Sequence, residues 1–116
     1  IVFMAAIANL LIDQGATFTS TITVFNDDDS LFDTTGHTGA SQIRKSYSSS
    51  SASATFTVAF ADDRTTGEIT ISLTPTQTAA LEEGRYVYDV ELTKTSDSSV
   101  TRVIQGIVTV SPNATR

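Results

Sequence analysis

Several side chains that carry common protein chemistry are missing or rare in this sequence, which has no cysteine, one histidine and two prolines in 116 residues. Without cysteine, the chain has no disulfide, no thiolate nucleophile and no cysteine-ligated zinc or iron–sulfur site. A single histidine excludes a metal site built from clustered histidines. We therefore expect no metal and no cofactor held by these ligands.

Charge is scarce as well, and most of it has one sign. Charged residues make up 17% of the chain, and 7 basic against 13 acidic residues give a net charge of −6. Proteins that bind nucleic acid or anionic membranes concentrate lysine and arginine on one face, and this sequence has no basic run. We expect neither nucleic acid nor a membrane as a partner.

The longest apolar stretch, residues 1–12, does not have the form of a membrane or targeting segment. Asn9 interrupts it and no basic residues precede it, unlike a spanning helix or a signal peptide. Met4 followed by two alanines has the form of a natural start, which would make residues 1–3 upstream or added residues. The length fits one domain, residues 1–116.

What the chain does contain is hydroxyl groups, with 20 threonines and 14 serines, or 34 of 116 residues. Hydrophobic residues make up 40%, which is enough for a folded core. Threonine, valine and isoleucine favour half-buried strands over helices. The composition therefore predicts a β domain.

Alternation of apolar and polar residues marks the strands. In 17–25, Phe18, Ile22 and Val24 share one face and threonines occupy the other. The same period, stronger or weaker, predicts further strands at residues 5–12, 40–47, 54–61, 68–73, 85–93 and 100–110. The segment 40–47 has few apolar residues, so we expect it at a sheet edge. The serine-rich residues 46–53 predict a hairpin loop.

One short helix is indicated between the strands at 68–73 and 85–93. Thr74, Pro75 and Gln77 fit the N-cap, first and third positions of a capping box, and Gly84 is placed to stop the helix. Seven strands separated by turns, with this one helical crossover between sheets, predict an all-β, immunoglobulin-like β-sandwich.

The last strand, 100–110, has apolar residues on both faces. We expect Ile104, Val108 and Val110 to share the core face, with Gly106 as a bulge, and Val103 and Ile107 to point outward. Outward apolar residues need cover, either from residues 5–12 or from another protein chain. Val103 and Ile107 are therefore the predicted interface residues.

Residues 81–88 (LEEGRYVY) resemble the corner between the fifth and sixth strands of immunoglobulin-like domains. In that resemblance Gly84 precedes the corner tyrosine, Tyr86, whose hydroxyl would bond to backbone a few residues upstream. Tyr88 stands where antibody domains carry their second cysteine. The absence of a cysteine pair and of tryptophan departs from antibody and receptor domains.

A resemblance that covers most of the chain is to the small immunoglobulin-like virion proteins of tailed bacteriophages, similar to the N-terminal domain of baseplate upper proteins. It rests on the order and spacing of Asp13–Phe18, Asp33–Ala40, Gln42–Arg44, Gly67–Thr74, Gly84–Leu92 and Gly106–Val110. The resemblance implies a non-enzymatic structural protein of a tail, baseplate or capsid surface. Its partners would be other virion proteins and copies of itself, and its location the virion.

Groups that might suggest catalysis or metal binding have ordinary explanations. Asp27–Asp29 with Asp33 could offer oxygen ligands to Ca²⁺. The pattern lacks the glycine and the final glutamate of an EF-hand loop, so it indicates a solvated turn. His37 has no triad partner at a suitable spacing, and no serine lies in a nucleophile elbow. Glu82 and Glu83 diverge at a helix end and do not form a pair with Glu91. We expect no enzyme activity.

Two alternatives remain open. The chain could be a carbohydrate- or host-surface-binding module displayed on the virion, for which Tyr47 beside Lys45 is the exposed aromatic residue to expect. It could also be an adhesive domain of a bacterial or eukaryotic protein.

Overall fold

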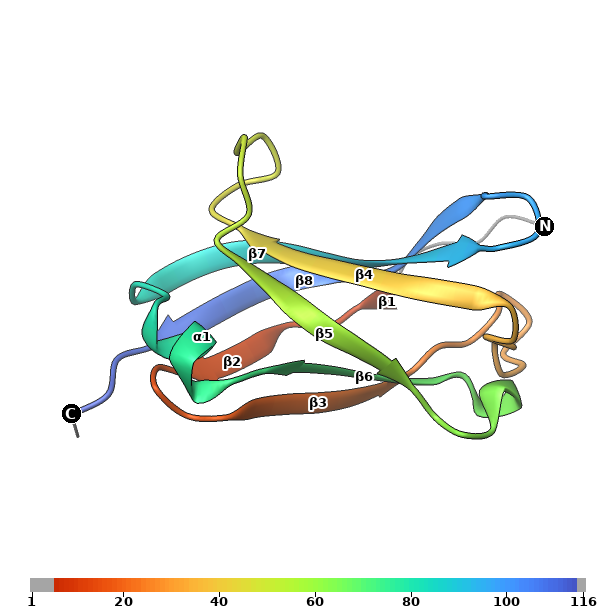
Figure 1. Cartoon of the computed structure of the whole chain (residues 1–116), viewed down its shortest axis with the longest axis horizontal. Coiled ribbons are helices and arrows are strands. Elements are labelled where there is room, and N and C mark those ends of the chain that lie inside the picture. The colour runs from red at the N-terminus through yellow and green to blue at the C-terminus, as the bar shows by residue number, and fades with distance from the viewer. Residues whose placement is uncertain (1–5, 115–116) are drawn as a thin grey trace.

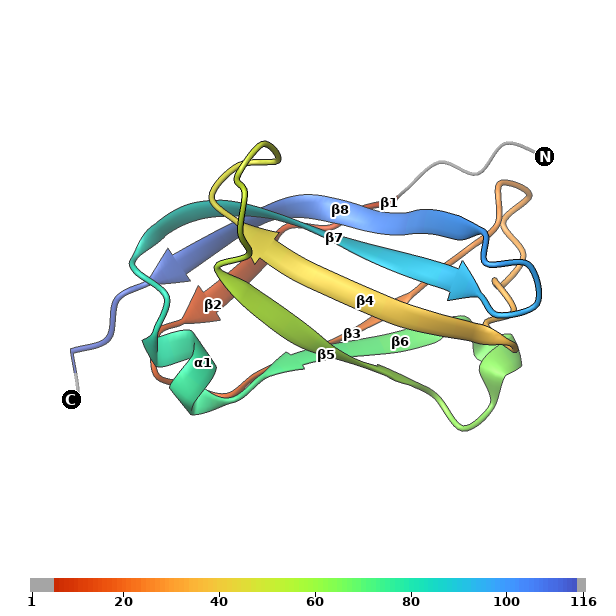
Figure 2. The ribbon, with the colours of Figure 1, turned by 45° about the horizontal axis from the view of Figure 1, so that its top comes forward.

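The computed structural model describes residues 6–114, which fold into two facing β-layers (Figures 1 and 2). The elements in chain order are β1 (Ala6–Ile7), β2 (Leu10–Asp13), β3 (Phe18–Thr23), β4 (His37–Arg44), β5 (Ala54–Phe60), the 3₁₀ turn η1 (Arg64–Thr66), β6 (Glu68–Leu73), α1 (Pro75–Ala79), β7 (Gly84–Lys94) and β8 (Val100–Ser111). The expected start at Met4 lies outside the described residues.

The strand order is β1–β8–β7–β4–β5–β6–β3, with β2 also pairing with β8. Strand β5 belongs to both layers, because its residues 54–56 pair with β4 and its residues 57–60 pair with β6. Strands β4, β7 and β8 form one layer, and β3 and β6 form the other (Figure 1). The predicted immunoglobulin-like β-sandwich is confirmed, with the segment 5–12 divided into β1 and β2.

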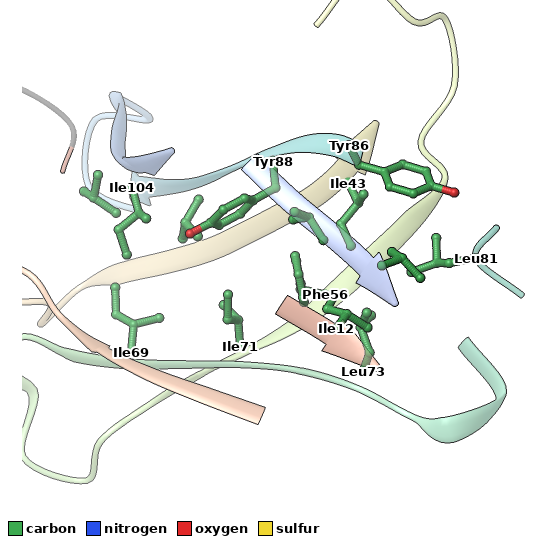
Figure 3. Packing of buried hydrophobic residues seen from close by; sticks show 14 of the residues in the cluster. Ile12, Ile43, Phe56, Ile69, Ile71, Leu73, Leu81, Tyr86, Tyr88 and Ile104 are labelled. Carbon is green, nitrogen blue, oxygen red and sulfur yellow. The ribbon is translucent and has the colours of Figure 1, made fainter. Parts of the chain in front are cut away.

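The core lies between the layers and is built from the inward positions of the alternating strands. Figure 3 shows isoleucines of β6 facing Tyr88 and Ile104 across the interior. The rings of Phe56 and Tyr88 meet edge to face at 5.9 Å, a favoured aromatic geometry. Within residues 6–114, the buried side chains of Thr34, Ser41 and Thr78 each donate a hydrogen bond, to Arg64 O, Asp89 O and Ala16 O respectively. These bonds satisfy the polar groups inside the sandwich.

Strand β4 is not the edge strand that its composition predicts, because it pairs with β7 on one side and β5 on the other. Two of its inward positions, Gly39 and Ser41, are small for a packing reason, whereas Ile43 on the same face is fully buried. A side chain at Gly39 would overlap with Val58 of β5, and Ser41 uses its inward hydroxyl to bond to β7. The close approach of β5 therefore replaces large apolar residues in β4.

The outward direction expected for Val103 is wrong. Val90 pairs with Ile104 and Glu91 pairs with Arg102, so Val103 has no partner in β7 and forms a β-bulge. The extra residue reverses the alternation, and Val103 and Ile104 are both 0% exposed. After the bulge, toward the end of β8, the expected pattern holds, since Val108 and Val110 are buried and Ile107 is exposed.

Gly106 is not the bulge, and its role is to allow a close approach. A Cβ at this position would overlap with the carbonyl oxygen of Ala8 and lie 2.8 Å from its carbonyl carbon. Glycine is required there because the chain between β1 and β2 runs directly against the backbone of β8.

The predicted capping box is present at α1. Gln77 N donates to Thr74 Oγ1 at 3.2 Å, and Thr74 N donates to Gln77 Oε1 at 2.9 Å. The helix joins β6 to β7, as the crossover prediction requires. It ends at Ala79, before Gly84 is reached, and Gly84 instead begins β7 with a φ of +133°.

Candidate interaction surface

Gly84, Tyr86 and Tyr88 serve the fold rather than an exposed site. The Tyr86 hydroxyl donates to the carbonyl oxygen of Glu82 at 2.7 Å, which is the contact expected of a corner tyrosine. Lys45 Nζ lies 4.4 Å from the centre of the Tyr86 ring. Both tyrosines are buried. This corner fixes the start of β7, the strand that carries much of the outer surface described below.

Tyr88 reaches the opposite end of the sequence. Its hydroxyl donates to the carbonyl oxygen of Ala8 at 2.6 Å, and burial raises the pKa of Tyr88 to about 12. Two further bonds hold the same stretch, from Ala8 N to Gln105 O at 2.9 Å and from Ile107 N to Asn9 Oδ1 at 3.0 Å. The N-terminal strands are thereby fixed against β8.

An apolar strip results on the outer face of these strands. We give this name to Ile7, Leu11 and Ile107, which are 75%, 64% and 44% exposed. Ile7 lies opposite Gln105 and Leu11 opposite Thr109, so both share the outward face of β8 with Ile107. Isolated exposed apolar residues are ordinary, whereas a group on adjacent strands marks a surface available for contact.

Of the two predicted interface residues, the structure therefore leaves Ile107 at the surface and removes Val103. The sequence reasoning included residues 5–12 as possible cover but did not separate Ile7 and Leu11 from their neighbours. The signal was present, because Ile7, Asn9 and Leu11 alternate with Ala8, Leu10 and Ile12. In β2 the second set turns inward, and Ile12 is fully buried.

A polar groove of about 230 Å³ lies on the outer face of β4, β7 and β8. Its polar lining residues are Gln42, Arg44, Tyr47, Asp89, Glu91 and Arg102. The groove adjoins the apolar strip through Val87, which lines it and pairs with Ile107. One continuous surface thus joins apolar and charged side chains.

Contacts within the polar groove hold several of its side chains in place. Arg102 Nε lies 3.2 Å from Asp89 Oδ2, and the Arg102 guanidinium is 6.0 Å from the centre of the Tyr47 ring. Arg44 donates to Gln42 Oε1 at 2.8 Å and to Ser49 O at 2.9 Å. Tyr47 is 58% exposed, in agreement with the sequence prediction. It belongs to the serine-rich loop, residues 46–53, which projects from this layer in Figures 1 and 2.

The groove residues other than Tyr47 were missed by sequence reasoning. Asp89 and Arg102 come from different strands, and their pairing depends on the bulge that shifts the register at Val103. No local pattern signals such a pair.

In the acidic turns, the aspartate carboxylates accept hydrogen bonds from nearby residues of the same turn. Asp28 accepts hydrogen bonds from the hydroxyl and N–H of Ser30, which lower the pKa of Asp28. Hydrogen bonds from Thr35 lower the pKa of Asp33 in the same way. Within residues 6–114, no three histidine, aspartate or glutamate side chains are grouped so that they could hold a metal ion. These carboxylates act as turn caps.

The remaining candidates for chemistry lie apart from one another. His37 Nδ1 contacts Thr35 O at 3.1 Å, and its ring packs against Phe32 at 5.3 Å. Glu82 and Glu83 lie on the exposed corner before β7, whereas Glu91 lines the polar groove. No helix in the described part of the chain is long and apolar enough to span a membrane.

Comparison with known proteins adds similarity at the level of structure only. No family model matches the sequence, and no curated protein matches it. Similar solved structures include InlP of Listeria monocytogenes, with a TM-score of 0.47 and 16% identity over 90% of this chain and 26% of that chain. The NK cell receptor NKp44, described as a triggering partner in natural cytotoxicity, gives a TM-score of 0.45 and 20% identity over 93% of this chain and 99% of that chain.

A family 123 glycoside hydrolase from Clostridium perfringens gives a TM-score of 0.41 and 10% identity over 93% of this chain. The chain spans about a quarter of the length of that hydrolase and of InlP, at 23% and 26%. All three similarities are weak, so the immunoglobulin-like assignment rests on the strand order and the tyrosine corner of this chain itself.

Proposed function

We propose that this chain is a non-enzymatic structural module of a bacteriophage virion, on the tail, baseplate or capsid surface, that works through protein–protein contacts. The observation that carries the proposal is the apolar strip, which exposes Ile7, Leu11 and Ile107 together on one face. The family resemblance of the sequence supplies the virion context. The partners are other virion proteins and further copies of the chain.

The surroundings of the apolar strip suit a protein interface. Stable interfaces combine an apolar centre with a polar rim, and the polar groove supplies such a rim beside the strip. Two arginines and two acids in the groove, Arg44 and Arg102 against Asp89 and Glu91, sum to zero charge. The excess of negative charge, −6 for the whole chain, therefore lies elsewhere. A neighbour can approach this face without meeting that excess charge.

The test is incorporation of surface variants into particles of the phage that encodes the chain. Ile107→Asp and Leu11→Asp place a charge in the apolar strip at exposed positions, so the isolated protein keeps its thermal stability. The matched control is Leu31→Asp, an exposed position on the turn that follows β3. Mass spectrometry of purified virions should find the control at the parental level and the two strip variants depleted at least tenfold. Parental levels of the strip variants, or absence of the parent chain from virions, would refute the proposal.

A second function, display of a carbohydrate- or host-surface-binding module, is favoured by the polar groove alone. An exposed tyrosine beside paired arginine and carboxylate groups offers both a stacking surface and hydrogen bonds to sugar hydroxyls. A glycan array and a calcium titration test it, with Tyr47→Ala as the matched variant. Blank results from both measurements would remove this candidate.

A further inference from the structure

The layer that contains β3 has an open edge. Strands β1 and β2 both pair in parallel with β8, and β3 pairs with β6. The N-terminal strands therefore extend the opposite layer, and within the described residues no strand pairs with the outer side of β3. Figure 1 shows β3 as the last strand of its layer.

The ladder between β3 and β6 determines which backbone groups face this edge. Val24 N donates to Gly67 O at 2.9 Å, which continues the register of Thr23 with Glu68 and Ile22 with Ile69. Hydrogen-bonded pairs alternate along an antiparallel ladder, so Ile22 and Ser20 direct their N–H and C=O groups toward β6. Thr19, Thr21 and Thr23 consequently direct theirs away from β6, toward the open edge.

This edge lacks the usual protection against strand addition. Natural edge strands carry lysine, proline or bulges, whereas residues 14–25 include no charged residue and no proline. The inward-facing side chains of β3 are also partly uncovered along the open edge. Phe18, Ser20 and Ile22 are only half-buried, although their partners in β6, Leu73, Ile71 and Ile69, are buried.

We propose that the β3 edge is a strand-addition site for a second copy of the chain, with the two β3 strands antiparallel across a two-fold axis. The occupant follows from the symmetry and charge of the segment. Two chains with a net charge of −6 repel each other, and this uncharged strand is where their backbones can meet at the least electrostatic cost. The proposal goes beyond the proposed function, because the apolar strip takes no part in it.

The register follows from the direction of the free backbone groups. A two-fold axis beside Thr21 sets Thr21 opposite Thr21 of the other copy and Thr19 opposite its Thr23, which pairs residues whose N–H and C=O groups face the edge. In the dimer, the sheet formed by β5, β6 and β3 then continues into the same three strands of the second copy, which gives a sheet of six strands.

Sedimentation equilibrium of the purified chain over a range of concentrations tests this pairing. Thr21→Pro removes one edge N–H without removing a β3–β6 hydrogen bond, and Thr21→Lys keeps the N–H but sets two charges against each other. The matched control is Thr21→Ala, which keeps the N–H and adds no charge. The parent and the control should double in mass with rising concentration, whereas the proline and lysine variants should stay monomeric with at least a tenfold weaker association.

Hydrogen exchange identifies the surface, since the amides of Thr19, Thr21 and Thr23 should become protected only in the dimer. A parent chain that stays monomeric to about 1 mM, a Thr21→Lys variant that dimerises as the parent does, or a dimer with these amides unprotected would each overturn the proposal. So would a chain that stays monomeric but binds an extended peptide at β3. Ile107→Asp should leave this dimer intact, which separates the result from the virion experiment.

Discussion

The close approach at Gly106 gives a quantitative test of how the N-terminal strands are held. The substitution Gly106→Ala adds a Cβ that overlaps with the Ala8 carbonyl oxygen and lies 2.8 Å from the carbonyl carbon. Both obstructing atoms belong to backbone, which cannot rotate away as a side chain can. We therefore expect the segment around Ala8 and Asn9 to lift off β8 while the remaining sandwich stays folded.

The expected cost follows from the contacts that this movement breaks. Three hydrogen bonds depend on it, from Tyr88 Oη to Ala8 O, from Ala8 N to Gln105 O and from Ile107 N to Asn9 Oδ1. At about 1 kcal/mol each, they contribute about 3 kcal/mol. Alanine in place of glycine lowers the conformational entropy of the unfolded chain, which offsets up to about 1 kcal/mol of this loss. The free energy of unfolding should fall by about 2 kcal/mol.

Urea unfolding followed by circular dichroism measures this change, with Thr109→Ala on the same strand as a control expected to lie within about 0.5 kcal/mol of the parent. In the parent chain, Tyr88→Phe should lower the free energy of unfolding by about 1 kcal/mol or more, because it removes the hydrogen bond to Ala8. In the Gly106→Ala variant, Tyr88→Phe should leave the free energy of unfolding almost unchanged, because that hydrogen bond is already broken. Additive effects, or a loss below about 0.5 kcal/mol for Gly106→Ala, would refute the reasoning.

Three further predictions concern the core, acid and alkali. Val103→Ala should lower the free energy of unfolding by about 1–3 kcal/mol in a urea titration because the side chain is buried at the bulge, whereas Ile107→Ala should change it by less than about 0.5 kcal/mol. Acid should destabilise the protein below about pH 4, because hydrogen bonds hold the pKa of four turn aspartates below its value in the unfolded chain. The stabilisation from these carboxylates is present above the unfolded-state pKa and is lost as pH falls through the folded-state pKa. Asparagine at all four positions should flatten the dependence of the melting temperature on pH between 2 and 5, and the positions are Asp28, Asp33, Asp63 and Asp97. In alkali, the raised pKa of Tyr88, about 12 against 10 in the unfolded chain, means that its contribution is complete below pH 10 and is lost as pH approaches 12. Burial also raises the pKa of Tyr86, so tyrosinate absorbance should show late titration of both buried tyrosines, and Tyr88→Phe should remove part of that late component.

Local chemistry made much of this fold predictable from the sequence. Alternation located the strands because one face of each strand packs in the core, and the capping box at Thr74 placed α1. The tyrosine corner was equally accessible, since the Tyr86 hydroxyl bonds within the same short segment, to Glu82. These features depend on residues that are close in the chain.

Features that depend on distant segments were not accessible in this way. The side of β8 on which Val103 lies is decided by its register with β7, and one unpaired residue reverses it. Gly39 and Ser41 make β4 look polar because β5 passes close to it, which no local pattern reports. The polar groove has the same origin, since Asp89 and Arg102 meet only after the strands are paired.

The parallel pairing of the first and last strands has a mechanical consequence. Strand β2 pairs with β8 in the same direction, Leu10 with Val108 through Asp13 with Ser111, and β1 begins and β8 ends toward opposite ends of the sandwich (Figure 1). A force that pulls the ends apart slides the two strands along each other and loads all of their hydrogen bonds together, rather than opening them one at a time. The rate of unfolding governs survival under such a force. A domain pulled in this way would transmit tension along its length before these two strands separated.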